Sequence, residues 1–171
     1  YLLTGAFASA ILVYGMALIY AGTGTTEIRL IGQLLHCDEA GECTNPYSRN
    51  TLVYIGMGLL FSGLAFKVSL APFHSWTPDV YQGAPTPITG FMSVATKAAA
   101  FALIARFFFT SFSELHSIWM PFFFGISVLT MLVGNIAAIF QDDVKRMLAY
   151  SGVAHAGYLL IGIVANSQDS V

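Results

Sequence analysis

Five stretches of about 20 mainly apolar residues run through this chain, and each is long enough to cross a lipid bilayer as a helix. Only 9% of the 171 residues are charged, whereas a soluble domain carries about 25% Asp, Glu, Lys and Arg. So few charges cannot cover a protein surface in water, and the lipid bilayer has to surround most of the chain. We therefore predict an all-α, polytopic transmembrane helix bundle, in which residues 1–171 form a single transmembrane domain fragment. The predicted helices cover residues 2–22, 51–71 with a broken continuation at 75–83, 87–109, 118–140 and 144–164.

Several chemistries lack the sequence motifs that they need. The net charge is −2 and no basic run is present, which argues against nucleic acid as a partner. There is no phosphate-binding loop, no glycine-rich dinucleotide turn and no CxxC pair, and the four histidines lack the spacing of metal ligands. We therefore expect this chain to bind no metal and no cofactor, and any redox chemistry to take place in other proteins.

A polar segment at residues 23–50 separates the first two apolar stretches. It is too polar to lie in lipid, so we predict an extramembrane loop. Cys37 and Cys43 both fall in this loop. They could form a disulfide if the loop faces an oxidising compartment, or stay as two free thiols, and their spacing does not decide between the two.

Prolines interrupt the chain between the second and third apolar stretches. Each proline removes a backbone donor and blocks the continuation of a helix. The segment is nevertheless too aromatic for an ordinary surface loop, and non-helical backbone at membrane depth survives only where protein or a water-filled cavity satisfies it. Because broken helices mark ion and substrate paths in transporters, we predict a discontinuous helix; a proline-rich turn at the membrane interface is the alternative. The prolines are Pro72, Pro78, Pro85 and Pro87.

Three ionisable residues fall where lipid should exclude them. Lys67 lies 16 residues into its predicted helix, Lys97 lies ten residues into the next, and His155 lies 11 residues into the last. At about 1.5 Å per residue these positions are roughly 24, 15 and 17 Å from the helix starts, so all three share one slab of the membrane. A lysine at a helix centre costs about 2.5–3.5 kcal/mol on insertion, which favours a functional reason for keeping it.

A buried amine is able to exchange protons. Burial disfavours the charged ammonium, and an amine that alternates between its neutral and charged forms passes protons on. Histidine titrates near neutrality and both accepts and donates hydrogen bonds. We therefore predict a proton relay through Lys67, Lys97, His74 and His155, with His74 seven residues after Lys67 and so on the same helix face. A structural salt bridge, or a side chain that reaches for the membrane surface, is the alternative for each lysine.

Two runs of residues give the chain a resemblance to a known family. The first is FKVSLAPFHSWTPDVYQGAPTP at residues 66–87, followed by ATK at residues 95–97. The second lies within residues 141–160 and contains DVKRMLAYS and HAGY. Both closely resemble the N subunit of bacterial respiratory complex I and its mitochondrial and plastid relatives, and the resemblance extends over essentially the whole chain. The sequence DVYQGAP at residues 79–85 distinguishes the N subunit from the related L and M subunits.

The resemblance implies an antiporter-like fold of fourteen helices built on two inverted repeats, of which this chain looks like helices six to ten. The broken helix seven of that fold matches residues 72–78. Its central lysine matches Lys67, and the lysine of helix eight matches Lys97. His74 and His155 match positions on the hydrated axis of the family.

Two further groups of the family's proton path are expected outside this sequence. The glutamate of helix five, which is the expected partner of Lys67, would precede Tyr1. The lysine of helix twelve, which is the exit group, would follow Val171. The isolated fragment is therefore expected to be inactive.

The function implied by the resemblance is that of a proton-translocating, non-redox subunit of NADH-quinone oxidoreductase. Such a subunit couples electron transfer from NADH to quinone to proton pumping through the intramembrane Lys/His relay. NADH, quinone, FMN and iron-sulfur clusters would be bound by partner subunits, and the direct partners would be the antiporter-like and quinone-site membrane subunits of complex I. The expected location is the inner (plasma) membrane of a bacterium. The alternatives are an Mrp-type cation/proton antiporter or membrane-bound hydrogenase subunit of the same superfamily, and a membrane scaffold that moves no ions.

Overall fold

A computed structural model describes residues 1–35 and 50–166 of the chain, so that Cys37 and Cys43 lie outside the described residues. Every regular element in the described part is helical, and five helical spans are long and apolar enough to cross a membrane. The predicted all-α transmembrane bundle is therefore confirmed. The elements are α1 (Leu2–Thr23), α2 (Ile28–Leu34), α3 (Thr51–Val68), α4 (Trp76–Gly83), α5 (Thr86–Phe91), the π-helix η1 (Met92–Thr96), α6 (Lys97–Thr110), the 3-10 helix η2 (Ser113–Leu115), α7 (His116–Ile139) and α8 (Val144–Asn166).

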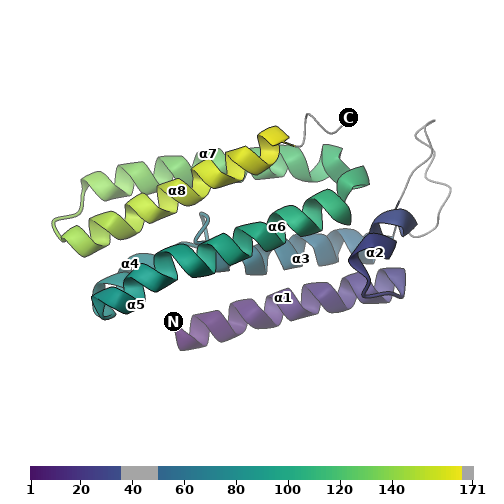
Figure 1. The fold of residues 1–171 in the computed structure, drawn as a ribbon, viewed down its shortest axis with the longest axis horizontal. Coiled ribbons are helices and arrows are strands. Elements are labelled where there is room, and N and C mark those ends of the chain that lie inside the picture. The colour runs from purple at the N-terminus through teal and green to yellow at the C-terminus, as the bar shows by residue number, and fades with distance from the viewer. Residues whose placement is uncertain (36–49, 167–171) are drawn as a thin grey trace.

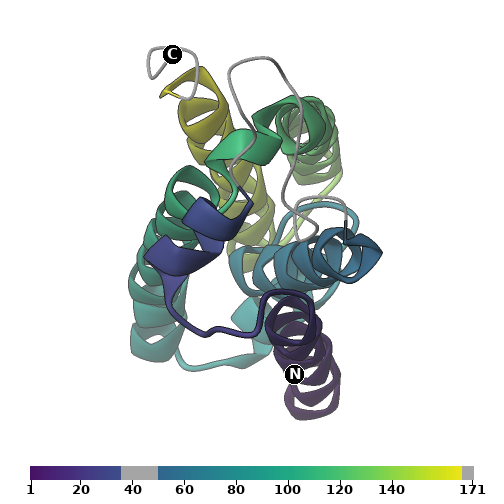
Figure 2. The same cartoon turned by 90° about the vertical axis from the view of Figure 1, so that its right-hand side faces the viewer.

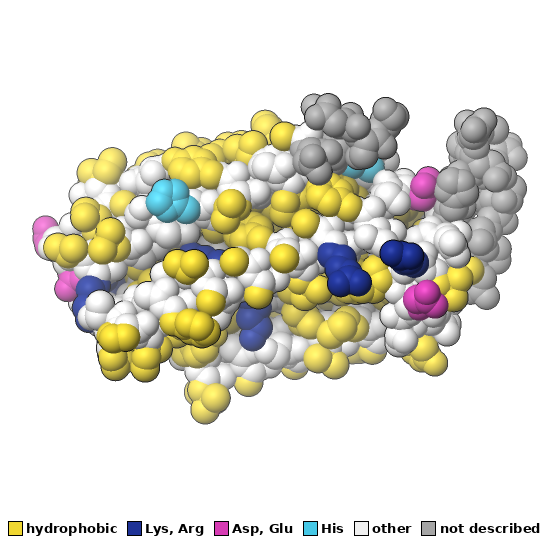
Figure 3. All heavy atoms as spheres, in the orientation of Figure 1, with side chains coloured by type: hydrophobic (Ala, Val, Ile, Leu, Met, Phe, Trp, Pro, Cys, Tyr) yellow, Lys and Arg dark blue, Asp and Glu magenta, His cyan; other side chains and the backbone are white. Residues whose placement is uncertain are grey.

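The long helices run along one common axis of the molecule (Figure 1). Viewed from the end of the bundle, α1 lies beside α3 and α7 lies beside α8 (Figure 2). On the face drawn in Figure 3, hydrophobic and uncharged atoms cover most of the surface, and the acidic side chains lie toward the two ends. A mainly apolar and uncharged surface suits a bundle that crosses a membrane, because charged groups are costly within lipid, and Lys and Arg side chains also lie midway along this face.

Glycine residues let α1 and α3 approach closely. Gly15 and Gly22 are buried on α1, and Gly56 and Gly63 are buried on α3, each pair seven residues apart and so on one helix face. A Cβ atom at Gly15 would lie 2.6 Å from the backbone nitrogen of Leu60. Membrane helices associate through small residues of this kind because their backbones then come into direct contact.

Close approach at a glycine also joins α7 to α8. A Cβ atom at Gly134 would lie 2.7 Å from the backbone nitrogen of Ala154. Close to it, the Ser127 hydroxyl donates a hydrogen bond of 2.7 Å to the carbonyl oxygen of Gly157. Packing and a buried interhelical hydrogen bond thus hold α8, which carries one wall of the candidate site described below, in a fixed position.

The second membrane helix is broken, as predicted. It ends at Val68, where Ser69 adopts a left-handed conformation with φ 65°, and α4 begins at Trp76. Figure 1 shows that α4 continues along the bundle axis beyond the end of α3. The helix ends three residues before the predicted residue 71, because the left-handed residue terminates it before Pro72 is reached.

The predicted extramembrane loop at residues 23–50 contains a short helix, α2. Ile31 and Leu35 are buried in the main hydrophobic core, and the Ser111 hydroxyl donates a hydrogen bond of 2.8 Å to the carbonyl oxygen of Ile28. The extramembrane position of this segment stays a prediction, and α2 within it is a helix that the sequence analysis did not anticipate. Its apolar residues recur at spacings of three and four, which makes one apolar helix face that packs against the end of α6.

Replacement of Gly56 by alanine is expected to destabilise the bundle, whereas replacement of Gly58 by alanine is not. The methyl group added at Gly56 would lie 2.8 Å from a side-chain carbon of Ile19 and would push α1 away from α3, at a cost of about 1–3 kcal/mol. Gly58 is on the same helix, and a methyl group there meets no described atom within 4 Å. Both changes alter helix propensity equally, so they form a matched pair.

Thermal denaturation of the purified full-length subunit measures the difference between the two variants. We expect a lower midpoint for Gly56→Ala than for Gly58→Ala. Equal midpoints would contradict the close approach of α1 and α3.

Candidate functional site

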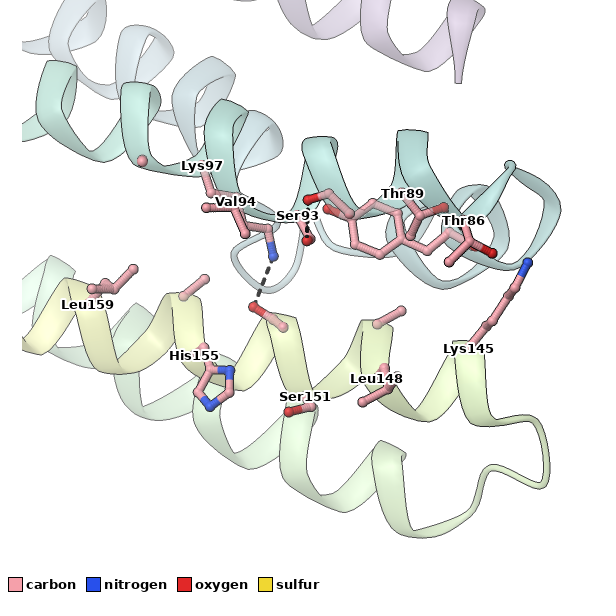
Figure 4. Close-up of a pocket in the computed structure, with 16 residues that line it drawn as sticks. Thr86, Thr89, Ser93, Val94, Lys97, Lys145, Leu148, Ser151, His155 and Leu159 are labelled. Carbon is pink, nitrogen blue, oxygen red and sulfur yellow. Dashed lines mark hydrogen bonds between the residues drawn. The ribbon is translucent and has the colours of Figure 1, made fainter.

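A cavity of about 610 Å³ lies between the third membrane helix, from α5 to α6, and α8 (Figure 4). Most of its walls are apolar, but four ionisable side chains line it: Tyr81, Lys97, Lys145 and His155. Because one water molecule occupies about 30 Å³ in the liquid, the cavity has room for several waters. The cavity therefore combines protonatable groups with space for a proton-conducting solvent.

Lys97 is the buried amine of this cavity, with 6% of the residue exposed. It is the first residue of α6 and directly follows the π-helix Met92–Thr96, a wide helical turn of a type often found at functional sites. Its Nζ atom donates a hydrogen bond of 2.9 Å to the carbonyl oxygen of Gly152 on α8, drawn as a dashed line in Figure 4. The amine thus points across the bundle to a neighbouring helix and does not reach for the membrane surface.

Glycine at position 152 keeps that carbonyl oxygen accessible. A Cβ atom there would lie 3.4 Å from the Lys97 Nζ atom, so a larger side chain would crowd the amine. Within the described part of the chain, Lys97 forms no ion pair. An ammonium has three N–H donors, and the Gly152 carbonyl accepts from one of them. The other two are available to groups or waters in the cavity.

An aromatic cluster connects the last turn of α3 to the cavity. The Lys97 Nζ atom lies 6.0 Å from the ring centroid of Tyr81, which is within the range of a cation–π interaction. The Tyr81 ring packs edge-on against Trp76 with centroids 6.1 Å apart, and Trp76 stacks on Phe66 at 5.4 Å. The indole Nε1 of Trp76 also donates a hydrogen bond of 3.0 Å to the carbonyl oxygen of Phe66. These rings lie on both sides of the helix break and are in contact across it.

His155 lines the same cavity but is exposed on the surface of the described chain. In Figure 4 its imidazole points away from the Lys97 amine. Its closest aromatic neighbour is Tyr158, with ring centroids 5.9 Å apart, and the Tyr158 hydroxyl accepts a hydrogen bond of 3.3 Å from Asn135. A proton passing from Lys97 to His155 would therefore need intervening water.

Lys67 and His74 lie outside the cavity. Lys67 is half-buried in the last turn of α3, and His74 lies in the break, where its buried Nδ1 atom has no hydrogen-bond partner among the described residues. The prediction that the two share one helix face is wrong, because α3 ends at Val68 and seven-residue spacing holds only along a continuous helix. The imidazole of His74 instead lies 6.4 Å from the ring of Tyr150 on α8.

The structure thus brings two of the four predicted relay residues to one cavity. Lys97 and His155 line it, whereas Lys67 and His74 lie at and beyond the end of α3. Among residues 1–35 and 50–166, no hydrogen bond joins any two of the four.

Two hydrogen bonds to buried hydroxyl groups stabilise the helix break. The Thr77 hydroxyl donates a buried hydrogen bond of 2.7 Å to the Ser69 hydroxyl, across the break. The backbone N–H of Ala71 donates a hydrogen bond of 3.0 Å to the hydroxyl of Thr130 on α7. Non-helical backbone at membrane depth requires partners of this kind, since no bulk water is available to it.

A polar cluster that sequence analysis missed joins α4 to α8. The Arg146 guanidinium donates a hydrogen bond of 2.6 Å to Asp79 and another of 3.0 Å to the side-chain oxygen of Gln82. Gln82 in turn donates one of 3.3 Å to Asp143, and the Nε atom of Arg146 donates one of 3.2 Å to Gln141. The available signal was the spacing of Asp79 and Gln82, which are three apart and so share a helix face. The cluster sets the position of α4, and with it Tyr81, relative to α8.

Comparison with known proteins finds a family that matches the whole of this chain. The model of the family described as "NADH:quinone oxidoreductase/Mrp antiporter, TM" matches residues 1–171. The NADH-quinone oxidoreductase subunit N of Moorella thermoacetica is 50% identical over 167 residues, which are 98% of this chain and 33% of that protein. The chain spans about one third of the length of the curated relatives that it matches.

Two solved structures show the same fold. A chain of respiratory complex I from Thermus thermophilus with bound aureothin matches with a TM-score of 0.73 and 40% identity, over 95% of this chain and 32% of that chain. A chain of the Mrp complex from Dietzia sp. matches with a TM-score of 0.81 and 27% identity, over 96% of this chain and 28% of that chain.

Among the described residues, no group of three or more His, Cys, Asp or Glu could hold a metal ion.

The hydrogen bond across the break predicts a non-additive pair of substitutions. Ser69 and Thr77 are both fully buried, so Ser69→Ala leaves the Thr77 hydroxyl without its acceptor and is expected to cost about 1–3 kcal/mol. Removing both hydroxyls with Ser69→Ala and Thr77→Val leaves no unpaired group, so the double variant should cost less than the sum of the single changes. Ser62→Ala is the control, since its hydroxyl bonds only within its own helix turn, at the surface.

Denaturation of the full-length subunit measures all four variants. A double variant whose loss equals the sum of the two single losses would show that the two hydroxyls do not interact.

Proposed function

We propose that this chain, which belongs to the NADH:quinone oxidoreductase/Mrp antiporter transmembrane family, is part of the N subunit of a proton-translocating NADH-quinone oxidoreductase. The main support is its 50% identity to a relative named as that subunit, over 98% of this chain. Fold alone does not separate the members of the family, because the TM-score to the Mrp complex is 0.81 and that to complex I is 0.73. Sequence identity favours complex I, at 40% against 27%.

The observation that carries the proton-translocating function is the position of the Lys97 amine. It is nearly buried, it has one protein acceptor in the described chain, and it opens into a cavity with room for water. Burial favours the neutral amine, whereas the Gly152 carbonyl and water favour the ammonium. A small change in the surrounding electrostatics is therefore enough to shift the proton on or off this nitrogen.

His155 is the proposed acceptor beyond Lys97. Lys97 and His155 both line the cavity. The hydroxyl groups of Ser93 and Ser151 line it as well, on the side of these two residues that faces Lys145. Lys145 marks that end in Figure 4, where it reaches toward the start of α5. Water within the cavity would connect these groups, because hydroxyls and imidazole both donate and accept hydrogen bonds.

Lys67 is the proposed donor to Lys97, with His74 beside it in the helix break. The aromatic cluster of Phe66, Trp76 and Tyr81 lies between the end of α3 and the cavity, so the proton has to pass around these rings. We infer that α4, which carries Trp76 and Tyr81, shifts relative to α3 during the cycle. The break supplies the freedom for that movement, because no continuous helical hydrogen bonding ties α4 to α3.

The driving force is proposed to come from partner subunits. NADH, FMN, iron-sulfur clusters and quinone belong to those subunits in the proposed assembly, and this chain contributes the membrane path. One charge that crosses a potential of 100 mV requires about 2.3 kcal/mol, which electron transfer from NADH to quinone has to supply. The proposed location is the plasma membrane of a bacterium, because the relatives named as subunit N come from bacteria.

A second candidate is a subunit of a cation/proton antiporter. The observation that favours it is the TM-score of 0.81 to the Mrp complex. The two candidates differ in what drives the proton: an antiporter exchanges it for a cation without NADH. Proton movement in membrane vesicles that depends on added sodium and not on NADH would support the antiporter and contradict our proposal.

Replacement of Lys97 tests the proposed function. Both Lys97→Ala and Lys97→Arg are expected to lower NADH-driven proton pumping by the assembled enzyme at least about tenfold, which corresponds to about 1.4 kcal/mol on the barrier. Arginine keeps the charge and the donors but does not release its proton, so Lys97→Arg separates proton transfer from charge. Arg106→Lys, an exposed position on the same helix, is the control and should pump normally.

Inverted membrane vesicles with a fluorescent pH indicator give the pumping rate, and NADH oxidation is followed in the same sample. Wild-type pumping by Lys97→Arg would contradict a proton-carrying role for this amine.

A further inference from the structure

Tyr81 carries a buried hydroxyl group for which the described chain offers no partner. The residue is 3% exposed and lines the Lys97 cavity from α4. Its hydroxyl oxygen is buried and has no hydrogen bond to any described residue. An unpaired buried hydroxyl costs about 1–3 kcal/mol, so its presence calls for an explanation.

Packing alone does not explain the hydroxyl. The ring of Tyr81 contacts Trp76 edge-on at 6.1 Å and lies 6.0 Å from the Lys97 Nζ atom. The backbone carbonyl of Tyr81 accepts a hydrogen bond of 3.3 Å from the hydroxyl of Thr89. A phenylalanine at this position would make all of these contacts equally well. The hydroxyl group therefore contributes to none of the contacts that hold the side chain in place.

The side chains of Tyr81 and Lys97 line the same cavity. The Lys97 ammonium has two N–H donors beyond the one that the Gly152 carbonyl accepts, and a phenolic oxygen is able to accept from a donor. A water molecule in the cavity would satisfy both groups, and bridging waters are nearly as favourable as direct hydrogen bonds.

The polar cluster of Asp79 and Arg146 keeps this arrangement in place. Asp79 lies two residues before Tyr81 on α4, and Arg146 lies six residues before Gly152 on α8. The 2.6 Å contact between Asp79 and Arg146 ties these two helices together, and the Lys97 amine contacts both of them, through the Tyr81 ring on α4 and the Gly152 carbonyl on α8.

We propose that the Tyr81 hydroxyl is a proton-relay group of the Lys97 cavity. The inference rests on the proposed function and adds a residue to its path. An N–H bond of the Lys97 ammonium breaks and its proton passes to a cavity water, which gives a proton to the Tyr81 oxygen. The phenol's own proton leaves at the same time to the next water. Lys97 ends neutral, Tyr81 ends as the neutral phenol, and one proton has moved along the cavity.

Replacement of Tyr81 by phenylalanine tests this proposal. The substitution keeps the ring and removes the hydroxyl, so assembly of the complete enzyme should be preserved. We expect NADH-driven proton pumping per assembled enzyme to fall about fivefold or more, because general acid–base groups typically contribute at least this much. The slowdown of pumping in D2O should also become larger, since proton transfer then limits the rate. A role in packing alone would not change this isotope effect.

Tyr14→Phe is the matched control, because Tyr14 is exposed on α1 and lies outside the cavity. It should pump like the wild type. Wild-type pumping and an unchanged isotope effect in Tyr81→Phe, or an equal loss in Tyr14→Phe, would overturn the proposal.

Comparison with the Lys97 variants distinguishes the role of Tyr81 from the role of Lys97. If Lys97→Arg loses pumping and Tyr81→Phe does not, the role of Tyr81 is wrong and the proposed function stands. If Lys97→Arg pumps normally, the proton-carrying role of the Lys97 amine fails, and the role of Tyr81 fails with it.

Discussion

An amine within a membrane bundle has to be hydrated or hydrogen-bonded, because an isolated charge in a low-dielectric interior is too costly. The arrangement around Lys97 meets this constraint. The π-helical turn precedes the lysine, glycine at position 152 exposes a carbonyl acceptor on the neighbouring helix, and the cavity provides space for water. The same glycine-based packing that joins α7 to α8 fixes that acceptor. The position of the Lys97 amine therefore depends on the packing of the helices around it.

The broken helix is the second requirement of the fold. A continuous helix from Thr51 to Gly83 would leave no non-helical segment in the membrane and no freedom for α4. In the structure, hydroxyl groups of Thr77 and Thr130 stabilise the interruption, and the cluster around Arg146 attaches α4 to α8. Thus α4 packs more closely against α8 than against α3, the helix that precedes it in the chain.

Hydrophobic stretches and ionisable residues at mid-depth predicted the membrane fold, the helix break and a buried lysine at position 97. They did so because length and apolar composition are local properties of a sequence. The direction in which a side chain points is not local. His155 lines the cavity, but its imidazole points away from Lys97. Lys67 and His74 do not share a helix face, because α3 ends at Val68. The pairing of Asp79 with Arg146 joins residues 67 positions apart and left only a weak periodic signal.

The account depends on water around the Lys97 amine, and a high-resolution cryo-electron microscopy map of the complete assembly would show it most directly. The account predicts ordered water within hydrogen-bond distance of the Lys97 Nζ atom, continuing through the cavity toward His155. A cavity filled by a lipid acyl chain or by apolar side chains, with no water next to the amine, would contradict it.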